Sequence, residues 1–345
     1  MLKEGPQKYR KVMKKFDVLN VRSQALKTVL RVVKVFMNRN PKMPIPALRK
    51  NMERVLHLYS LSVPKPKYPI KIEHMYAEWV LAKQCAYDKV ILYLHGGGYA
   101  LGSCNTHRSL VNRIVDKSQV KALLIEYALA PESPFPAGLK DSLLAYEWLI
   151  AQGYQAKDII LMGDSAGGGL ALSSYLEIKA RKLPAPGGLV CLSPWTDLNC
   201  NRGSFAANKN TDMIVHHAVA SRLAGNYVGE YDFSHPQISP IYGDFNGCPP
   251  ILIQASSSEV LFDDSKDLAN LLKDQGLPVT FQVWKDMPHV WQIFSDIIPQ
   301  GREAISNISY FVRHTLGLEV YEQKSENHAK ESRSFQTEFS HFLQN

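Results

Sequence analysis

The stretch that most limits how this chain can fold is residues 163–167, Gly-Asp-Ser-Ala-Gly, which stand between two apolar runs. The run 159–162 is typical of a buried strand, and the apolar-periodic run from Ala166 onward is typical of a helix. A strand that enters a helix without a loop must turn sharply, which strains the central residue and brings the two flanking glycines together. This turn predicts that the Ser165 hydroxyl stands clear of the sheet edge, above the helix N-terminus, where negative charge is favoured.

The composition is that of a globular protein, with 345 residues, of which 45% are hydrophobic and 21% charged. This length suffices for one large α/β domain or two small ones. The chain has no apolar run of about 18 residues and no signal-peptide pattern at its N-terminus, so we expect neither a membrane span nor secretion. Five cysteines form no C-x-x-C pair. This pattern predicts a reducing, cytoplasmic location without a disulfide framework or a metal site.

The positive charge is concentrated at one end of the chain. Residues 1–57 hold 15 Lys and Arg against three Asp and Glu, a net charge of +12, whereas the remaining residues have a net charge of −4. We therefore expect no nucleic-acid binding by the main domain. Helical periodicity over 21–37 and a second helix over 47–57 leave two interpretations, a cap over a site in the main domain or a basic amphipathic contact with anionic lipid. The cap is favoured, because apolar stripes more often pack against protein.

Strand and helix patterns alternate along most of the remaining chain, which predicts a largely parallel sheet with helices on both faces. We expect a linker at 64–69, two antiparallel strands within 70–82, an irregular region at 194–248 and a polar tail from 319. The other expected strands are 90–94, 122–127, 159–162, 188–192, 250–255 and 279–284, and the other expected helices are 107–117, 139–152, one from 166, 265–275 and 295–315.

Ser165 needs backbone donors before it can act as a nucleophile, because its attack creates an oxyanion. The sequence His-Gly-Gly-Gly at 95–98 directly follows an expected strand, as does the oxyanion loop of lipases and esterases. Glycine lets the backbone approach a substrate carbonyl closely. We assign the N–H groups of Gly97, Gly98 and Ala166 to the oxyanion hole.

A hydroxyl also needs a base, which in this chain order should follow a late strand at the same sheet edge. His289 fits, because the expected strand 279–284 ends just before it. The acid should lie between Ser165 and His289. Glu259, just past the strand 250–255, is the favoured candidate. Asp263 is the alternative, and it is less favoured because it lies one turn later, where it would cap the next helix. The carboxylate would orient the imidazole and stabilise its protonated form.

Several longer motifs occur together over residues 70–315: HGGGY, LAPE-x-PFPA, GDSAGG, LSPWTDL, SPIYGD and an acid followed by VL-x-DDS. In this combination the chain resembles the hormone-sensitive lipase family of α/β-hydrolases, in the branch that carries GDSAG. The resemblance implies an α/β-hydrolase fold, a triad of Ser165, Glu259 and His289, and hydrolysis of short- to medium-chain carboxylic esters without a cofactor or metal. It also implies an N-terminal helical cap (1–63), a catalytic domain (64–318, with a cap contribution from about 195–230) and a polar tail (319–345).

The sequence differs from the family pattern in three places. The acid is Glu259, where many members have Asp. Glu-Tyr-Ala at 126–128 replaces Asp-Tyr-Arg, and serines at 256–258 replace a glycine. Apolar residues near the motifs either line an acyl or alcohol pocket or pack in the core or lid. These candidates are Tyr99, Leu101, Trp195, Met213, Val290 and Trp291.

Alternative functions use the same fold. The gibberellin receptors resemble this family but lack the histidine and bind a small molecule without cleaving it. A lipase tethered to lipid through residues 1–57 and an amide or formamide hydrolase would keep the chemistry and change the substrate. Members of the family are often homodimers, so a dimer is a further expectation, with an ester as the small-molecule partner.

Overall fold

The computed structural model describes residues 13–14, 21–38, 42–60 and 68–319. One sheet holds the nine strands found among them, in the order β1-β9-β8-β7-β6-β4-β5-β3-β2. The strands are β1 (Met13–Lys14), β2 (Tyr68–Ile72), β3 (Met75–Val80), β4 (Ala86–Leu94), β5 (Val120–Ile125), β6 (Ile159–Asp164), β7 (Gly188–Leu192), β8 (Ile251–Ser256) and β9 (Val279–Trp284).

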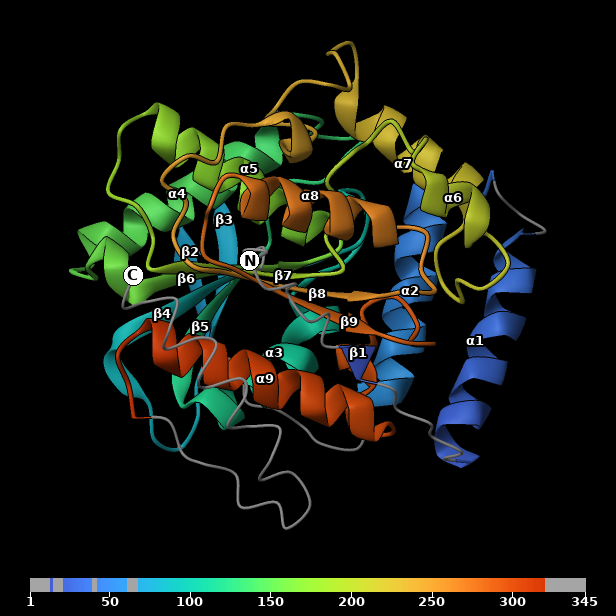
Figure 1. Cartoon of the computed structure of the whole chain (residues 1–345), viewed down its shortest axis with the longest axis horizontal. Coiled ribbons are helices and arrows are strands. Elements are labelled where there is room, and N and C mark those ends of the chain that lie inside the picture. Colours follow the sequence, from blue (N-terminus) through green and yellow to red (C-terminus); the bar gives the residue numbers. More distant parts are fainter. Residues whose placement is uncertain (1–12, 15–20, 39–41, 61–67, 320–345) are drawn as a thin grey trace, which may run out of the picture.

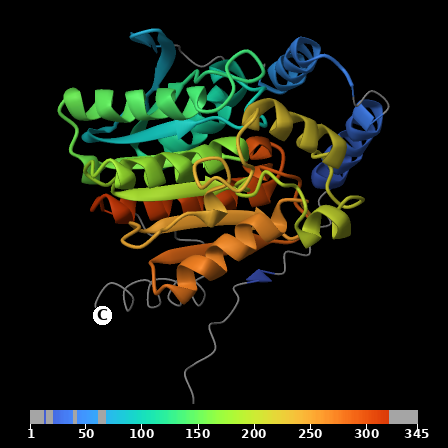
Figure 2. The same cartoon turned by 90° about the horizontal axis from the view of Figure 1, so that it is seen from above.

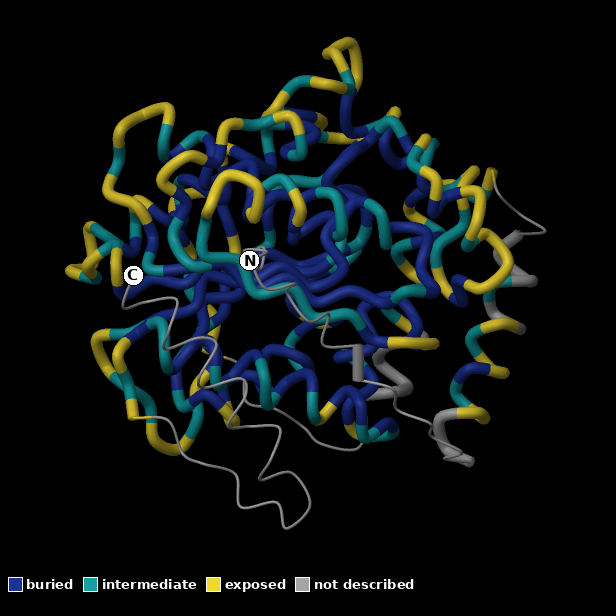
Figure 3. Tube along the Cα trace, in the orientation of Figure 1, coloured by how far each residue is buried: buried dark blue, intermediate teal, exposed yellow. Residues whose placement is uncertain are grey.

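The sheet is parallel from β5 through β1, and β2 and β3 form an antiparallel pair at the opposite edge. This arrangement confirms the largely parallel sheet and the two antiparallel strands expected within 70–82. Every residue of β6, β7 and β8 is buried, because helices cover both faces of a parallel sheet. The dark central strands in Figure 3 show this buried layer.

Helices cover the sheet on both sides (Figures 1 and 2). One face carries α3 (Cys104–Ser118) and α9 (Pro299–Thr315), and the other carries α4 (Ala137–Ala151), α5 (Ala166–Ala180) and α8 (Phe262–Asp274). Short 3₁₀ segments lie at Ala156–Asp158, Pro240–Tyr242 and Trp291–Phe294. Because β4 to β9 run parallel, their carboxyl ends all lie at one end of the sheet, where ligands bind in sheets of this kind.

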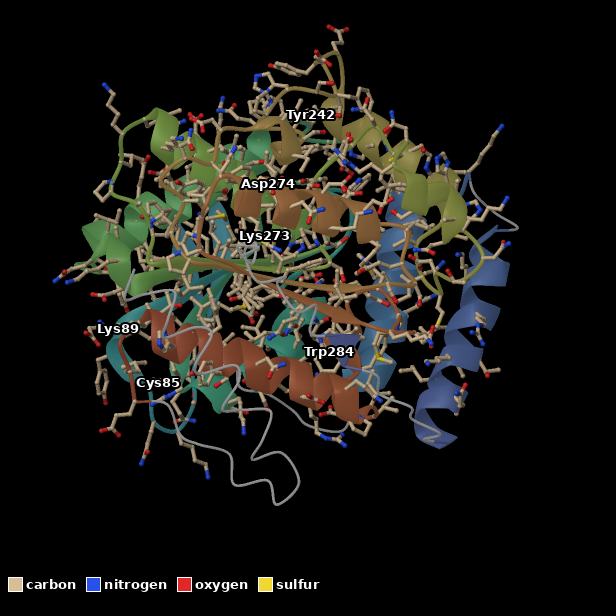
Figure 4. The ribbon with its side chains drawn as sticks, viewed as in Figure 1. Cys85, Lys89, Tyr242, Lys273, Asp274 and Trp284 are labelled. Carbon is tan, nitrogen blue, oxygen red and sulfur yellow. The ribbon has the colours of Figure 1, made fainter. Side chains whose placement is uncertain are left out.

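Four further helices gather at that edge (Figure 1): α1 (Val21–Asn38), α2 (Ile45–Ser60), α6 (Gly203–Ala207) and α7 (His217–Val228). Apolar side chains of α1 pack beside Trp284, which ends β9 on the side of the molecule where α1 and α2 lie (Figure 4). Lys34 of α1 also donates to the carbonyl oxygen of Asp212 at 2.6 Å. The helix α1 is thus attached to the main body of the molecule.

Several element boundaries differ from the predicted ones. The helix α3 begins at Cys104 because Ser103 and Thr106 form a capping box. The helix α8 begins at Phe262, so Asp263 lies in its first turn. The helix α9 begins only at Pro299, after the 3₁₀ segment Trp291–Phe294. The region 194–248 is not wholly irregular, since it contains α6 and α7.

Parts of some predictions fall outside the described residues, namely those on 1–12, 15–20, 39–41, 61–67 and the tail from 320. Along the described ranges, no helix combines the length and the apolar character that crossing a bilayer would require.

Candidate active site

The turn between β6 and α5 has the strained geometry that its sequence predicts. Ser165 adopts φ 53° and ψ −122°, in a region that residues with a side chain rarely occupy. A Cβ at Gly163 would lie 2.3 Å from the carbonyl oxygen of Gly167, and a Cβ at Gly167 would lie 2.0 Å from that of Leu94. Only glycine fits at either side, so the sharp turn that presents Ser165 is fixed by these two positions.

Asp164 lies beneath this turn and joins it to the glycine-rich loop. Its buried carboxylate accepts hydrogen bonds from the Tyr93 hydroxyl (2.8 Å) and the Gly96 N–H (3.1 Å), and it contacts Nε2 of His107 at 3.2 Å. Burial acts to raise the pKa of Asp164, but His107, Tyr93 and His95 together lower it more, so the net pKa is lowered. Asp164 is therefore a charged group that supports the turn from below.

The backbone of the glycine-rich loop is oriented by two hydrogen bonds to its carbonyl oxygens. Nδ1 of His95 lies 2.9 Å from the Gly96 oxygen, and the Leu101 N–H donates to the Gly97 oxygen at 2.8 Å. Because C=O and N–H point in opposite directions in a planar trans peptide, these bonds direct the Gly97 and Gly98 N–H groups the other way. His95, a residue for which the sequence predicted no role, fixes one of the two peptides.

His95 is neutral. A carbonyl oxygen only accepts, so the proton of the ring must reside on Nδ1. Burial, and next the nearby charge of His107, lower the pKa of His95 to about 3. The bond to Gly96 therefore persists through the neutral pH range.

The predicted oxyanion donors have free hydrogens. Among the residues the structure describes, no protein oxygen accepts a hydrogen bond from the backbone N–H of Gly97, Gly98 or Ala166. Both glycines have positive φ, 123° and 63°, and Ala166 is the first residue of α5. Free backbone N–H groups beside a nucleophile, one of them at the N-terminus of α5, are the donors that a developing oxyanion requires.

His289 and Glu259 are joined directly. The imidazole Nδ1 lies 2.5 Å from Oε2 of Glu259, whose Oε1 accepts the Ser256 N–H at 2.7 Å, and the carboxylate is fully buried. Burial acts to lower the pKa of His289, but the hydrogen bond and charge of Glu259, with the charges of Asp212 and Asp164, raise it more, so the net pKa is raised. The carboxylate of Asp263 is used differently, since it accepts the Ser204 N–H at 2.7 Å and pairs with Lys266.

Hydrogen bonds to two neighbouring residues at the end of β7 position Ser165 and the residue that follows His289. The Ser165 N–H donates to the Leu192 oxygen at 2.8 Å, and the Val290 N–H donates to Oγ of Ser193 at 3.4 Å. Within the described part of the chain the buried Nε2 of His289 has no hydrogen-bond partner, Ser165 included. Catalytic hydrogen bonds are commonly long before substrate binds, so this separation is compatible with a triad.

A segment preceding α7 holds the loop that carries Glu259. Asp212 accepts the Val260 N–H at 2.9 Å through one oxygen and the N–H groups of Ile214 and Val215, both at 2.8 Å, through the other. Asn208 donates to the Glu259 carbonyl oxygen at 2.8 Å. Sequence reasoning missed Asp212, because its local turn is recognisable but its bond to a residue 48 positions away has no local signature.

Replacing Asp212 by alanine is expected to destabilise the fold by about 3 kcal/mol, because three N–H groups lose their acceptor. Urea unfolding measures this loss, and ester turnover should fall with it as the Glu259 loop loosens. Asp274→Ala is the matched control, at the exposed C-terminal end of α8 (Figure 4). Equal stability of the two variants would contradict the assignment.

The six predicted pocket residues are all buried, Leu101 most exposed at 9%. Tyr99 stacks on Tyr227 with ring centroids 3.8 Å apart, and Leu101 packs with Ile45 and Leu48 of α2. The others lie within or beside the packed interior: Trp195, Met213, Val290 and Trp291. Contact of these side chains with an acyl or alcohol group therefore stays a prediction.

The described ranges contain no cluster of three or more His, Cys, Asp or Glu side chains arranged to hold a metal ion. The five cysteines are free thiols.

Comparison with known proteins identifies the family to which this fold and site belong. A family profile described as the alpha/beta hydrolase fold matches residues 91–293. The chain is 40% identical to an acetyl-hydrolase of Streptomyces hygroscopicus, over 75% of this chain and 86% of that protein. The chain belongs to the α/β-hydrolase family. An esterase of Acinetobacter venetianus is 31% identical, over 77% of this chain and 88% of its own length.

Solved structures place the chain within this family more narrowly. An esterase from the bacterial hormone-sensitive lipase family is 36% identical, with a TM-score of 0.81, covering 87% of this chain and all of that one. An esterase/lipase from an uncultured bacterium is also 36% identical, with a TM-score of 0.79, covering 86% of this chain and 99% of that one. The resemblance to the hormone-sensitive lipases is thus confirmed, and so is the assignment of this α/β-hydrolase to the carboxylic ester hydrolases.

Proposed function

We propose that this carboxylesterase uses Ser165 as nucleophile, His289 as general base and acid, and Glu259 as the group that orients the imidazole. The hydrogen bond between Nδ1 of His289 and Glu259, at 2.5 Å, is the observation that carries this proposal. It leaves Nε2 unprotonated while the imidazole is neutral, and this is the nitrogen that must take the serine proton.

The reaction then proceeds by acyl transfer in two steps. Nε2 of His289 takes the Ser165 proton as Oγ attacks the ester carbonyl, and the N–H groups of Gly97, Gly98 and Ala166 hold the oxyanion. Collapse of this intermediate breaks the bond to the alcohol, which leaves with the proton from His289. Water, deprotonated by His289, attacks the acyl-enzyme and releases the acid and the free Ser165 hydroxyl.

Labelling with diethyl p-nitrophenyl phosphate tests the nucleophile. We expect stoichiometric release of p-nitrophenol and a diethylphosphoryl group on the peptide that contains Ser165, detected by mass spectrometry. Modification at another serine, or no modification, would contradict the assignment.

The substrates we propose are short- to medium-chain esters. The acetyl-hydrolase relative supports a short acyl group, and so does the packing of α2 against Leu101 beside the glycine-rich loop. A series of p-nitrophenyl esters from acetate to palmitate tests this, with an optimum at the short end expected. Preference for palmitate, with vesicle binding lost on deletion of residues 1–57, would favour the tethered lipase instead, and no turnover of any ester would favour a receptor. Homodimer formation and a cytoplasmic location stay predictions.

The pH dependence of kcat/KM should report His289. The imidazole must be neutral to accept a proton, so activity rises as pH rises through its pKa in the folded enzyme. Burial acts to lower this pKa, but Glu259, Asp212 and Asp164 together raise it more, so the net pKa is raised. We therefore expect the midpoint of the acid limb above the ordinary histidine value of about 6.5. A midpoint below that value, measured with an uncharged ester, would contradict the pairing.

A further inference from the structure

We infer that Arg49, on the N-terminal helix α2, is a positioning residue for the oxyanion loop, so that α2 contributes to the rate of the chemical step as well as covering the site. This inference rests on the proposed esterase mechanism. Neither the glycine-rich motif nor the triad includes Arg49, which lies 46 positions before the first residue of the loop, His95.

One guanidinium bridges two separate backbone segments. Nε of Arg49 donates to the Ala100 carbonyl oxygen at 2.7 Å, and Nη2 donates to that of Ala130 at 2.8 Å. The two terminal nitrogens also bind both oxygens of Glu132, at 2.8 and 2.7 Å. The planar fork is thereby held in one orientation, with its remaining donors aimed at the two carbonyls.

The first of these carbonyls, that of Ala100, belongs to the turn that orients the oxyanion donors. The N–H groups of Ala100 and Leu101 both donate to the Gly97 oxygen, the bond that directs the Gly98 N–H in the opposite sense. The Ala130 N–H donates to the Tyr99 oxygen at 2.9 Å. The guanidinium therefore ties the outer side of this turn to the segment that already holds Tyr99.

The rest of α2 makes contacts with the same loop. Ile45 and Leu48 pack on Ala100 and Leu101, and Glu53 accepts a hydrogen bond from the Ser103 hydroxyl. Arg49 lies between these contacts along the helix and is only 27% exposed. A helix that served only as a cover would need the apolar contacts and not a guanidinium shared between two loop carbonyls.

Arg49→Ala, Arg49→Lys and the control Arg54→Ala test the inference in the full chain. Arg54 is an exposed residue of the same helix, so its loss removes the same charge without touching the loop. We expect Arg49→Ala to lower kcat for p-nitrophenyl acetate about thirtyfold with little change in KM, less than the 10²–10³ lost with a direct donor. Arg49→Lys should lose about fivefold, because an ammonium does not reproduce the planar fork.

Two measurements distinguish positioning from partial unfolding. The final extent of phosphorylation by diethyl p-nitrophenyl phosphate counts correctly folded Ser165 sites, and kcat is expressed per site. The affinity for a trifluoromethyl ketone, which forms a tetrahedral adduct, should fall in the same proportion as kcat/KM.

The inference is overturned if Arg49→Lys and Arg54→Ala both match the wild type in kcat per site and in ketone affinity, or if Arg49→Ala changes KM alone. Absence of turnover and labelling in the wild type would instead remove the proposed mechanism, a result independent of Arg49.

Discussion

Replacing Ser165 by alanine is expected to lower kcat for p-nitrophenyl acetate by a factor on the order of 10⁵ or more. The alanine variant keeps the φ and ψ of the turn and the oxyanion donors but lacks the oxygen that forms the acyl-enzyme. Water would have to attack the ester directly, and the remaining rate would come from binding and the oxyanion hole. Initial rates at high enzyme concentration, with diethyl p-nitrophenyl phosphate added to exclude traces of wild type, measure this loss.

Ser173→Ala is the matched control, since Ser173 lies on the same helix α5, is buried, and its hydroxyl has no hydrogen-bond partner in the described structure. Its removal should leave kcat unchanged. A Ser165→Ala variant that keeps more than about one hundredth of the wild-type rate, after such inhibition, would show that another group is the nucleophile.

Glu259→Gln is expected to have the second largest effect, lowering kcat on the order of 10³- to 10⁴-fold. The amide keeps the volume of the side chain but loses the charge that stabilises the imidazolium, and it no longer imposes the tautomer with the proton on Nδ1. Asp263→Asn should lose at most severalfold, because the amide oxygen still accepts the Ser204 N–H. The two variants share the same change of charge.

Turnover of p-nitrophenyl acetate, together with the midpoint of thermal unfolding, separates an effect on chemistry from an effect on folding. If Asp263→Asn lost more activity than Glu259→Gln at equal stability, the role of the acid would move to Asp263. Equal losses in both variants would leave neither carboxylate as the orienting group.

Much of the fold was predictable, because strands buried on both faces leave continuous apolar runs such as Ile159–Met162. Helix starts were harder. Phe262 begins α8 and Pro299 begins α9 at positions set by tertiary packing and by a preceding 3₁₀ segment. Within 194–248, α6 is only five residues long, too short to leave a clear period in the sequence.

The site also contains residues that the sequence predicted and residues that it did not. Ser165, His289 and the loop glycines stand in motifs whose spacing reflects local backbone geometry, and the structure joins His289 to the favoured acid, Glu259. The sequence did not predict the supporting hydrogen bonds made by His95, Arg49 and Asp212. Each acts through a carbonyl or N–H group of the main chain, often of a distant segment, and such a partner imposes no residue type that a single sequence would reveal.

The bonds from Asn208 and Asp212 to the Glu259 loop limit how this enzyme can be re-engineered. Exchanging the segment between β7 and β8 among relatives is one route to a new substrate preference, and it assumes that this segment is a separable module. Here residues 208–212 are built into the support of the acid, so a graft that replaced them would misplace the carboxylate before any new substrate was tried. A chimera that keeps those positions and varies only α7 and the residues after it avoids that failure.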